Sequence, residues 1–515
     1  MHVCLLGRVA AKVSGSRSIA PQVLIVSVAL VSMAFGQEIR GTIAGTVTDP
    51  QGAAVSGARV EIRGIDTNVV YPATTNDSGI YVLPLLPAGN YSISVTKEGF
   101  KRAQEQRVEL RVSERAQVDF HLEVGAVSQQ VLVTSEAPLL ETATASRDQV
   151  VSDKAVADLP YEGRNSFLTS AITSGFYFGS TDSLNAIRPF DNGGMDSMQI
   201  NGGLGFRNNF TINGLPDTAQ ESANPASLTY VPPPDAVKEV SVESNAYDAQ
   251  YGHTGGGTIN VDLKSGTNQF HGAVYEYVRN TIFNANRWEN NASGAARTPY
   301  HWSEPGIELD GPVYIPHLYN GKDKTFFMFS WERIQDGVPQ PLTASVPTLQ
   351  QLTGDFSATT SGGKPVTIYD PLTTSQTSPG VYTRTAFPGN IIPANRINPV
   401  GAKLISYYPK PNAAGTLDHL NNYFDGATVV TDKYDVFSYT VDQSINEKNR
   451  MSFSYFQANR HQVEPTYDFG SPAASPLYTH YRVNHGGSIN WTSTLNPTTV
   501  LDIRDGFERH NFAVV

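Results

Sequence analysis

Apolar and polar residues alternate in short runs along most of this chain, and clusters of Gly, Pro, Asn and Asp separate the runs. Thr42–Thr48 (TIAGTVT), Ala58–Arg63 (ARVEIR) and Tyr91–Lys97 (YSISVTK) show the pattern clearly. A period of two places successive side chains on opposite faces, so each run predicts a β-strand that buries one face. The clusters between them predict turns. We therefore expect a mainly β protein.

The strands predicted between residues 37 and 124 are short, and turn clusters such as Asn76–Gly79 and Pro87–Asn90 separate them. This spacing is typical of a β-sandwich. Asp49 and Asp77 raise the alternative of a calcium site, but both occupy turn positions, where Asp commonly hydrogen-bonds its own backbone. We predict an independent β-sandwich with no metal site.

Seven further strand candidates follow Asn268, and the gaps between them are alternately long and short. They are Phe270–Val278, His301–Tyr314, Phe326–Ile334, Tyr434–Asp442, Met451–Ala458, Tyr481–Thr492 and Val500–Glu508. Outer-membrane β-barrels show this rhythm, because short periplasmic turns alternate with long external loops. A soluble sheet with one buried face would show the same alternation within each strand, but it would not explain the rhythm of the gaps.

The two faces of these candidates differ in polarity. In Tyr434–Asp442, positions 437, 439 and 441 are apolar or aromatic, and positions 438, 440 and 442 are polar. A strand in lipid needs apolar residues outside and polar residues inside. We expect several aromatic residues of these strands to anchor the lipid interface: Tyr275, Tyr277, Phe327, Phe329 and Trp331.

Three consecutive glycines, Gly255, Gly256 and Gly257, precede the alternating run Thr258–Leu263. Without a Cβ they permit close approach of other backbone. A second break, Lys264–Asn268, leads into the first strand candidate described above. The pattern predicts a strand packed tightly against other backbone, then a sharp exit into a new unit.

Composition agrees with an all-β chain: Gly (44), Tyr (24) and Phe (23) are plentiful among 515 residues, and charged residues make up only 17%. No stretch after residue 36 approaches the ~20 apolar residues of a spanning helix. If the chain crosses a membrane, it must therefore do so as a closed barrel, which pairs all backbone polar groups. The net charge of −11 argues against a nucleic-acid partner.

The first 36 residues are typical of a secretory signal, with basic residues before the apolar core Val23–Met33 and small residues at Ala34 and Gly36. The only cysteine, Cys4, precedes that core, so cleavage would leave a chain without disulfides. Cleavage would also remove three positive charges and no negative ones, and take the net charge from −11 to −14.

Several of these segments resemble the TonB-dependent outer-membrane receptors, in particular their Oar-like branch. Tyr247–Gly272 is similar to the boundary between plug and barrel, and Phe387–Gly401 (FPGNIIPANRINPVG) to a motif in a large insertion. Residues 37–124 resemble a carboxypeptidase regulatory-like domain, of carbohydrate binding-like fold, through GTVTDPQGAAVSGARV and NDSGIYVLPLLPAGNYSISV. Phe210–Pro216 resembles a plug strand and turn in which Asn213 replaces the usual Asp.

The resemblance implies an N-terminal β-sandwich, a mixed α/β plug and the first strands of an incomplete antiparallel transmembrane β-barrel. The implied organisation is a signal peptide (1–36), the sandwich (37–124), a linker (125–142), the plug (143–266) and a partial barrel (267–515). Receptors of this class have barrels of about twenty-two strands. We therefore expect this sequence to be a fragment of a longer protein.

The linker contains one short alternating segment, which the resemblance identifies with the TonB box: Gln130, Val131, Leu132, Val133, Thr134 and Ser135. The alternative is an ordinary linker strand. The resemblance implies a receptor in the Gram-negative outer membrane, in contact with its lipid, with the sandwich in the periplasm. It would take up an unidentified extracellular ligand with energy relayed by the TonB complex. Gly255–Gly257 would pack the plug against the barrel.

A non-transporting surface or adhesion protein is the alternative function. We expect no enzyme, because the sequence contains no G-x-S-x-G, H-E-x-x-H or P-loop motif. We also expect no cofactor and no metal. His301 and Glu304 are close enough in sequence to form a metal pair, but no further ligand lies near them.

Overall fold

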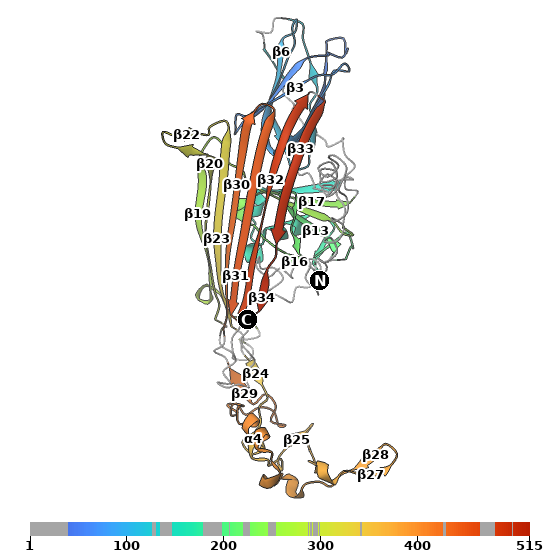
Figure 1. Cartoon of the computed structure of the whole chain (residues 1–515), viewed down its shortest axis with the longest axis vertical. Helices are drawn as coiled ribbons and strands as arrows, with labels where there is room; N and C mark the ends of the chain where they lie inside the picture. The colour runs from blue at the N-terminus through green and yellow to red at the C-terminus, as the bar shows by residue number, and fades with distance from the viewer. Residues whose placement is uncertain are drawn as a thin grey trace, which may run out of the picture.

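The computed structural model describes residues 40–125, 130–133, 147–178, 198–204, 207–219, 227–245, 254–286, 288, 291, 297, 299–339, 342–425, 429–463, 479–496 and 498–514. The predicted signal segment lies outside these residues. The described part is mainly β with few helices, as expected. It contains a two-sheet sandwich, a central unit (residues 147–263) and a large antiparallel sheet, with a long excursion between two strands of that sheet (Figure 1).

The sandwich consists of two sheets that share one core. The first contains β4 (Ile80–Leu86), β1 (Gly41–Thr48), β7 (Arg115–Gln117) and β8 (Phe120–His121). The second has the order β3 (Val70–Thr74), β2 (Arg59–Gly64), β5 (Gly89–Thr96), β6 (Arg102–Leu110) and β9 (Gln130–Val133). The predicted alternation is confirmed, since every second residue of β1 is buried.

The apolar side chains of both sheets meet in this core, where Ile43, Ile62 and Ile93 are fully buried. Burial of each such side chain contributes about 1.5–3 kcal/mol. Asp49 closes its own turn by accepting hydrogen bonds from the amides of Gln51 and Ala53 at 2.9 and 2.8 Å. This is the backbone role expected of it.

The central unit is built on a mixed five-stranded sheet. Its order is β10 (Arg147–Ser152), β17 (Val237–Asn245), β18 (Thr258–Leu263), β13 (Asn209–Ile212) and β14 (Leu215–Pro216). Only β13 and β18 are parallel among these pairs. The turn between β13 and β14 contains Asn213 and Gly214, both with positive φ (49° and 76°). That geometry is typical of a type I′ hairpin and explains why Asn suits the position.

Short elements surround this sheet. The helix α2 (Asp153–Asp158) is capped by Ser152 and ends just before Leu159–Pro160, because the residue before a proline avoids helical angles. The others are η1 (Glu162–Arg164), η2 (Ser166–Ile172), β11 (Phe176–Phe178), β12 (Met198–Ile200), β15 (Thr218–Ala219), β16 (Ser227–Leu228) and η6 (Pro234–Ala236). No helix among the described residues is long and apolar enough to cross a membrane.

Residues beyond Asn268 form an eight-stranded antiparallel sheet that is open in the described part of the chain. Its order is β19 (His271–Asn280), β20 (His301–Pro312), β23 (Thr325–Pro339), β30 (Val429–Asn446), β31 (Asn449–Val463), β32 (Thr479–Asn496) and β33 (Thr499–Arg509), with β34 (Phe512–Val514) also beside β32. These seven strands overlap the seven predicted segments, and they pair in the same order as they occur along the chain. All seven strand predictions are therefore confirmed. Several strands are longer than predicted: β30 has 18 residues.

The loop rhythm is also visible in space. Short connections join β30 to β31 and β32 to β33 at the end of the sheet that faces the sandwich (Figure 1). The excursion between β23 and β30 extends from the opposite end, and residues 342–425 of it are described. It contains paired strands β24 (Leu342–Ala344) and β29 (Tyr423–Asp425), the helix α4 (Pro399–Ile405) and two small hairpins, β25 (Thr360–Ser361) with β26 (Lys364–Pro365) and β27 (Ser375–Ser378) with β28 (Val381–Thr383).

The two faces of the large sheet differ as predicted in β30, but the inner face is less polar than expected. Ser438 and Thr440 are buried on the inner face, whereas Tyr439 is 39% exposed on the outer face. The inner face also carries apolar residues that share a core with the central unit: Trp302, Met328, Ile334, Tyr434, Val436, Phe456 and Ala458. A wholly polar inner face is therefore the wrong expectation where another unit packs on it.

Candidate functional site: the contact between the central unit and the large sheet

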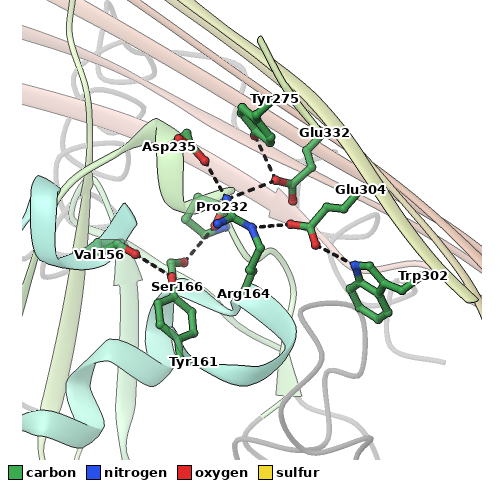
Figure 2. Close-up of polar contacts among 10 residues, drawn as sticks. All are labelled: Val156, Tyr161, Arg164, Ser166, Pro232, Asp235, Tyr275, Trp302, Glu304 and Glu332. Carbon is green, nitrogen blue, oxygen red and sulfur yellow. Dashed lines mark hydrogen bonds and ion pairs between the residues drawn. The ribbon is translucent and has the colours of Figure 1, made fainter. Parts of the chain in front are cut away.

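Arg164 is presented to the large sheet by a tightly fixed loop of the central unit. Gly163 and Arg164 both have positive φ (77° and 48°), so the chain reverses sharply at this point. On one side, Tyr161 Oη donates a hydrogen bond to the Val156 carbonyl at 2.8 Å. On the other, Ser166 Oγ donates to the Pro232 carbonyl at 2.9 Å (Figure 2). These contacts hold the Arg164 backbone in place, so its side chain enters the interface with little freedom.

The Arg164 guanidinium lies among three carboxylates. Its Nε donates to Glu304 Oε1 at 2.6 Å, and its Nη2 donates to Asp235 Oδ2 at 2.6 Å and lies 3.9 Å from Glu332 Oε2. The guanidinium carbon also lies 3.7 Å from the centre of the Tyr277 ring, within the range of a cation–π contact. One cation of the central unit thus contacts β19, β20 and β23 of the large sheet.

The carboxylates have further donors from the sheet. Trp302 Nε1 donates to Glu304 Oε2 at 2.8 Å, and Tyr275 Oη donates to Glu332 Oε2 at 2.9 Å (Figure 2). The side chains of Arg164 and Glu304 are only 14% and 1% exposed. Removing such groups from water is costly, and the cost is offset only when every charge keeps its partners. Burial alone would lower the pKa of Arg164, but Glu304, Glu332 and Asp235 outweigh it and raise that pKa.

A second group of contacts joins the central unit to β30, β31 and β32. The Tyr230 ring lies 4.6 Å from the Phe456 ring, and its hydroxyl hydrogen-bonds Ser438 Oγ. Asn484 Nδ2 donates to the Thr229 carbonyl at 2.6 Å. Asp217 accepts hydrogen bonds from Thr229 Oγ1 and the Tyr230 amide at 2.6 and 3.0 Å. Burial, and then the nearby Glu508 carboxylate, hold the pKa of Asp217 well above its usual range.

The expected close approach at the glycine triplet is present inside the central unit. A Cβ on Gly256 would lie 2.2 Å from Asn208 Oδ1, and one on Gly257 would lie 2.7 Å from Ile200 Cδ1 and 3.0 Å from the Glu243 carbonyl. A Cβ on Gly255 would meet only ordinary contacts, the nearest at 3.6 Å. All these neighbours belong to the central unit, so the glycines pack its own strands together rather than packing it against the sheet.

A close approach to the large sheet occurs instead at Gly266, in the Lys264–Asn268 break that follows the central unit. A Cβ there would lie 2.4 Å from the Phe327 carbonyl and 2.5 Å from the Gly311 carbonyl. Sequence reasoning identified the Lys264–Asn268 break but did not single out this glycine. Its position at the centre of that break was the available signal.

The TonB-box-like residues Gln130–Val133 form β9, which pairs in parallel with β6. The register places Gln130 opposite Arg102 and Val133 opposite Glu105. Thr134 and Ser135 lie outside the described residues. In the described part of the chain, β9 is the last strand of its sheet, so its second edge has no strand beside it.

The ion cluster around Arg164 was missed by sequence reasoning, and two aromatic predictions were wrong. Tyr275 and Tyr277 were expected to anchor the lipid interface, but both face Arg164. Phe329 does lie on the other face, with its ring 5.2 Å from that of Tyr439. The sequence held no distinct signal for the cluster, because β20 and β23 also carry the carboxylates Glu308, Asp310 and Asp336.

The sequence raised His301 and Glu304 as an alternative metal pair. Glu304 is occupied by Arg164 and Trp302. No group of three or more His, Cys, Asp or Glu side chains among the described residues is arranged to hold a metal ion.

Comparison with known proteins shows what this chain resembles. Residues 262–515 match the model of an outer membrane beta barrel domain, and residues 42–123 match that of the carboxypeptidase regulatory-like domain. The TonB-dependent transporter Oar of Myxococcus xanthus is 24% identical over 308 residues, which make up 58% of this chain and 27% of Oar. This chain is a relative of the Oar-like TonB-dependent receptors.

Solved structures similar to this chain include the outer membrane transporter YddB from Escherichia coli, with 11% identity and a TM-score of 0.41. A mutant of the ferric enterobactin receptor PfeA from Pseudomonas aeruginosa has 9% identity and a TM-score of 0.39. The matches cover 70% and 71% of this chain, and 38% and 41% of those chains. The chain thus spans well under half the length of these relatives.

These matches agree with the predicted location in the Gram-negative outer membrane. Oar is a transporter and not an enzyme, in agreement with the expectation that this chain performs no catalysis.

Proposed function

We propose that this chain serves TonB-dependent uptake of an extracellular ligand across the outer membrane. In this proposal the large sheet is part of the barrel wall, and the central unit is the plug that occupies its interior. The observation that carries the proposal is the contact described above. The central unit shares an apolar core with the inner face of the sheet and places Arg164 among carboxylates that include Glu304 and Glu332 of two strands.

The segment Gln130–Ser135 is proposed as the coupling site for the TonB complex. An extended segment with a free edge can pair with a strand of a partner protein through its backbone hydrogen bonds. The extended form of Gln130–Val133 and its position at the edge of a sheet support this role. The sandwich, which carries this strand, lies at the end of the sheet with the short connections (Figure 1). In outer-membrane barrels that end faces the periplasm.

The ligand is proposed to bind on the opposite side. Residues 342–425 extend beyond that end of the sheet, where the external loops of such barrels lie. Within this segment Arg396 forms two hydrogen bonds to Asp370, at 2.9 and 2.5 Å, which fix the fold of the FPGNIIPANRINPVG motif. The chemical class of the ligand stays open: siderophores, oligosaccharides, peptides and proteins are all compatible.

The test replaces Val131 by proline in the intact natural protein. Proline removes the backbone N–H and fixes φ, so the segment can no longer pair as a regular strand. The probe is the purified periplasmic domain of TonB from the same organism, and its binding to the receptor in detergent is measured by calorimetry. We expect Val131→Pro to abolish binding.

The matched control is Val131→Thr, which keeps a β-branched side chain and the N–H, and should bind like the wild type. Equal binding of the proline variant and the wild type would remove this segment from the mechanism. A wild-type protein that does not bind TonB at all would favour the alternative, a non-transporting surface protein.

A further inference from the structure

The sandwich lies across the end of the large sheet that has the short connections (Figure 1). It contacts that end at few points. Arg40 Nη1 donates to Thr492 Oγ1 on β32 at 2.7 Å, and its Nη2 forms an ion pair with Asp502 Oδ1 on β33 at 2.8 Å. The Asn268 amide, just before β19, donates to the Asp66 carbonyl of the sandwich at 3.0 Å.

Two further contacts complete the attachment to the sheet. The guanidinium carbon of Arg450, at the start of β31, lies 4.4 Å from the centre of the Tyr71 ring of the sandwich. Phe326 of β23 is 3% exposed and is the one residue of the sheet that joins the apolar core of the sandwich, among the described residues. Among the described residues, the contacts named here are one apolar ring, one ion pair, one side-chain hydrogen bond, one cation–π contact and one backbone hydrogen bond.

A polar contact between described residues also ties the sandwich to the central unit. The Val112 amide, in the sandwich, donates a hydrogen bond to the Glu239 carboxylate on β17. Like most of the contacts to the sheet, it is polar. Interfaces of this composition resemble those between domains that move relative to one another.

These contacts surround a cavity of about 510 Å³ that is bounded by all three units. Tyr71 and Tyr91 line it from the sandwich, Leu263 from the end of the central unit, and Ser454 and Ser488 from the inner face of the sheet. The sandwich forms the wall of this cavity that lies beyond the end of the sheet. Any solute that reached the cavity along the inner face of the sheet would meet the sandwich next.

We infer that the sandwich is a periplasmic lid over this cavity, held closed by the Arg40–Asp502 ion pair, and that it moves away when the cavity empties. Its weak attachment is the physical basis for the motion. The central unit is held to the sheet by a continuous apolar core and buried charges, so the lid is the unit that separates first. The passage of a transported solute through the cavity rests on the proposed function, but the opening of the lid does not.

The test measures how fast a cysteine in the cavity reacts with a bulky, charged maleimide. In the intact protein, purified in detergent after removal of its signal segment and with no other cysteine, a single Ser454→Cys substitution serves as the reporter. Ser375→Cys, on the exposed strand β27, gives the rate of an open site. We expect the reporter at position 454 to react at least about tenfold more slowly than the one at position 375.

Loss of the ion pair should open the lid. Arg40→Ala should accelerate labelling at position 454 by about tenfold, the factor that corresponds to ~1.4 kcal/mol. Asp502→Asn keeps the shape of the side chain, so it tests the same contact if the alanine variant does not fold. The charge-swapped pair Arg40→Asp with Asp502→Arg should slow labelling again.

The control is Arg107→Ala, which removes an arginine whose hydrogen bond, to Asn90 at 3.2 Å, stays within the sandwich. It should leave the labelling rate unchanged. The inference is overturned if the wild-type reporter reacts as fast as the one at position 375. It is also overturned if Arg40→Ala and Asp502→Asn both leave a slow rate unchanged. Because no TonB and no ligand are present, neither result bears on the proposed coupling segment.

Discussion

The large sheet holds its two neighbours in different ways. The central unit meets it through a shared apolar core, and Arg164 is buried there among three carboxylates. The sandwich meets it through one apolar ring and a few polar contacts. A buried charge cluster inside an apolar contact tolerates few alternative arrangements, whereas scattered polar contacts can be exchanged for water. The first interface is therefore suited to fixing a unit, and the second to releasing one.

The largest effect should come from Arg164→Ala. It leaves Glu304, Glu332 and Asp235 without their cation, and loss of one partner from a buried ion group costs about 3–5 kcal/mol. We expect the free energy of unfolding, from urea titration in lipid vesicles, to fall by that amount. The control is Arg333→Ala, because the Arg333–Asp435 pair is more exposed and such pairs contribute about 0–1 kcal/mol. Equal losses of unfolding free energy in the two variants would contradict the view that the buried Arg164 cluster stabilises the fold more than an exposed ion pair does.

A similar but smaller loss is expected from Phe456→Ala on the inner face of β31. Phe456 is 1% exposed and packs on Tyr230 of the central unit. Truncation of a buried phenylalanine costs about 3–5 kcal/mol, and relaxation of the neighbours favours the lower end. Phe456→Leu keeps most of the volume and should cost less than about 1.5 kcal/mol. If the alanine variant unfolds at the same urea concentration as wild type, the central unit does not pack on this face.

The glycine triplet provides an intermediate test within the central unit. Gly257→Ala would place a Cβ within 3.0 Å of the Glu243 carbonyl, which cannot rotate away, so we expect a loss of about 1–3 kcal/mol. Gly255→Ala meets nothing closer than 3.6 Å and should change stability by less than about 1 kcal/mol. Thermal unfolding of the two variants provides the comparison. A larger loss at position 255 than at position 257 would show that the strands pack differently.

The smallest effect concerns pH and the contact of the sandwich with the central unit. Burial, and then Asp262, raise the pKa of Glu239 to about 8, although the Val112 amide, Lys238 and Arg111 oppose the shift. A carboxyl with a raised pKa stabilises the folded state when it is protonated, so its contribution is greatest below pH 4.5 and is lost as pH rises towards 8. The unfolding temperature of wild type relative to Glu239→Gln should therefore decline from pH 5 to pH 8. If the difference in unfolding temperature between wild type and Glu239→Gln stays constant from pH 5 to pH 8, protonation of Glu239 does not contribute to stability.

Much of the fold could be predicted because it depends on local patterns. Alternation identified the seven long strands, and Asn213–Gly214 identified a hairpin turn, since only a few residues accept positive φ there. The strand ends could not be predicted as well: β30 begins at Val429 rather than Tyr434, and Asp432 and Lys433 continue the ladder through their backbones. Alternation also shows that a strand has two faces without showing what covers each one.

The candidate site was hardest to predict because its members are distant in sequence. Arg164 and Glu304 are 140 residues apart, and the packing of the central unit on the inner face of the large sheet brings them together. Tyr275 and Tyr277 were misplaced for the same reason, since an aromatic residue suits either a lipid interface or a contact with arginine. The edge position of β9 likewise could not be predicted. It follows from the parallel pairing of β9 with β6, and no local sequence pattern indicates that pairing.

The most direct test of the account is a double-mutant cycle between Arg164 and Glu304 in the intact protein. Arg164→Met and Glu304→Gln are made separately and together, and the free energy of unfolding is measured for each in lipid vesicles. If the central unit packs on the inner face of the sheet as described, the double variant will lose less stability than the two single losses added together, by at least about 1 kcal/mol. Losses that simply add would mean that the two side chains do not meet, and the proposed plug would then have no fixed place in the barrel.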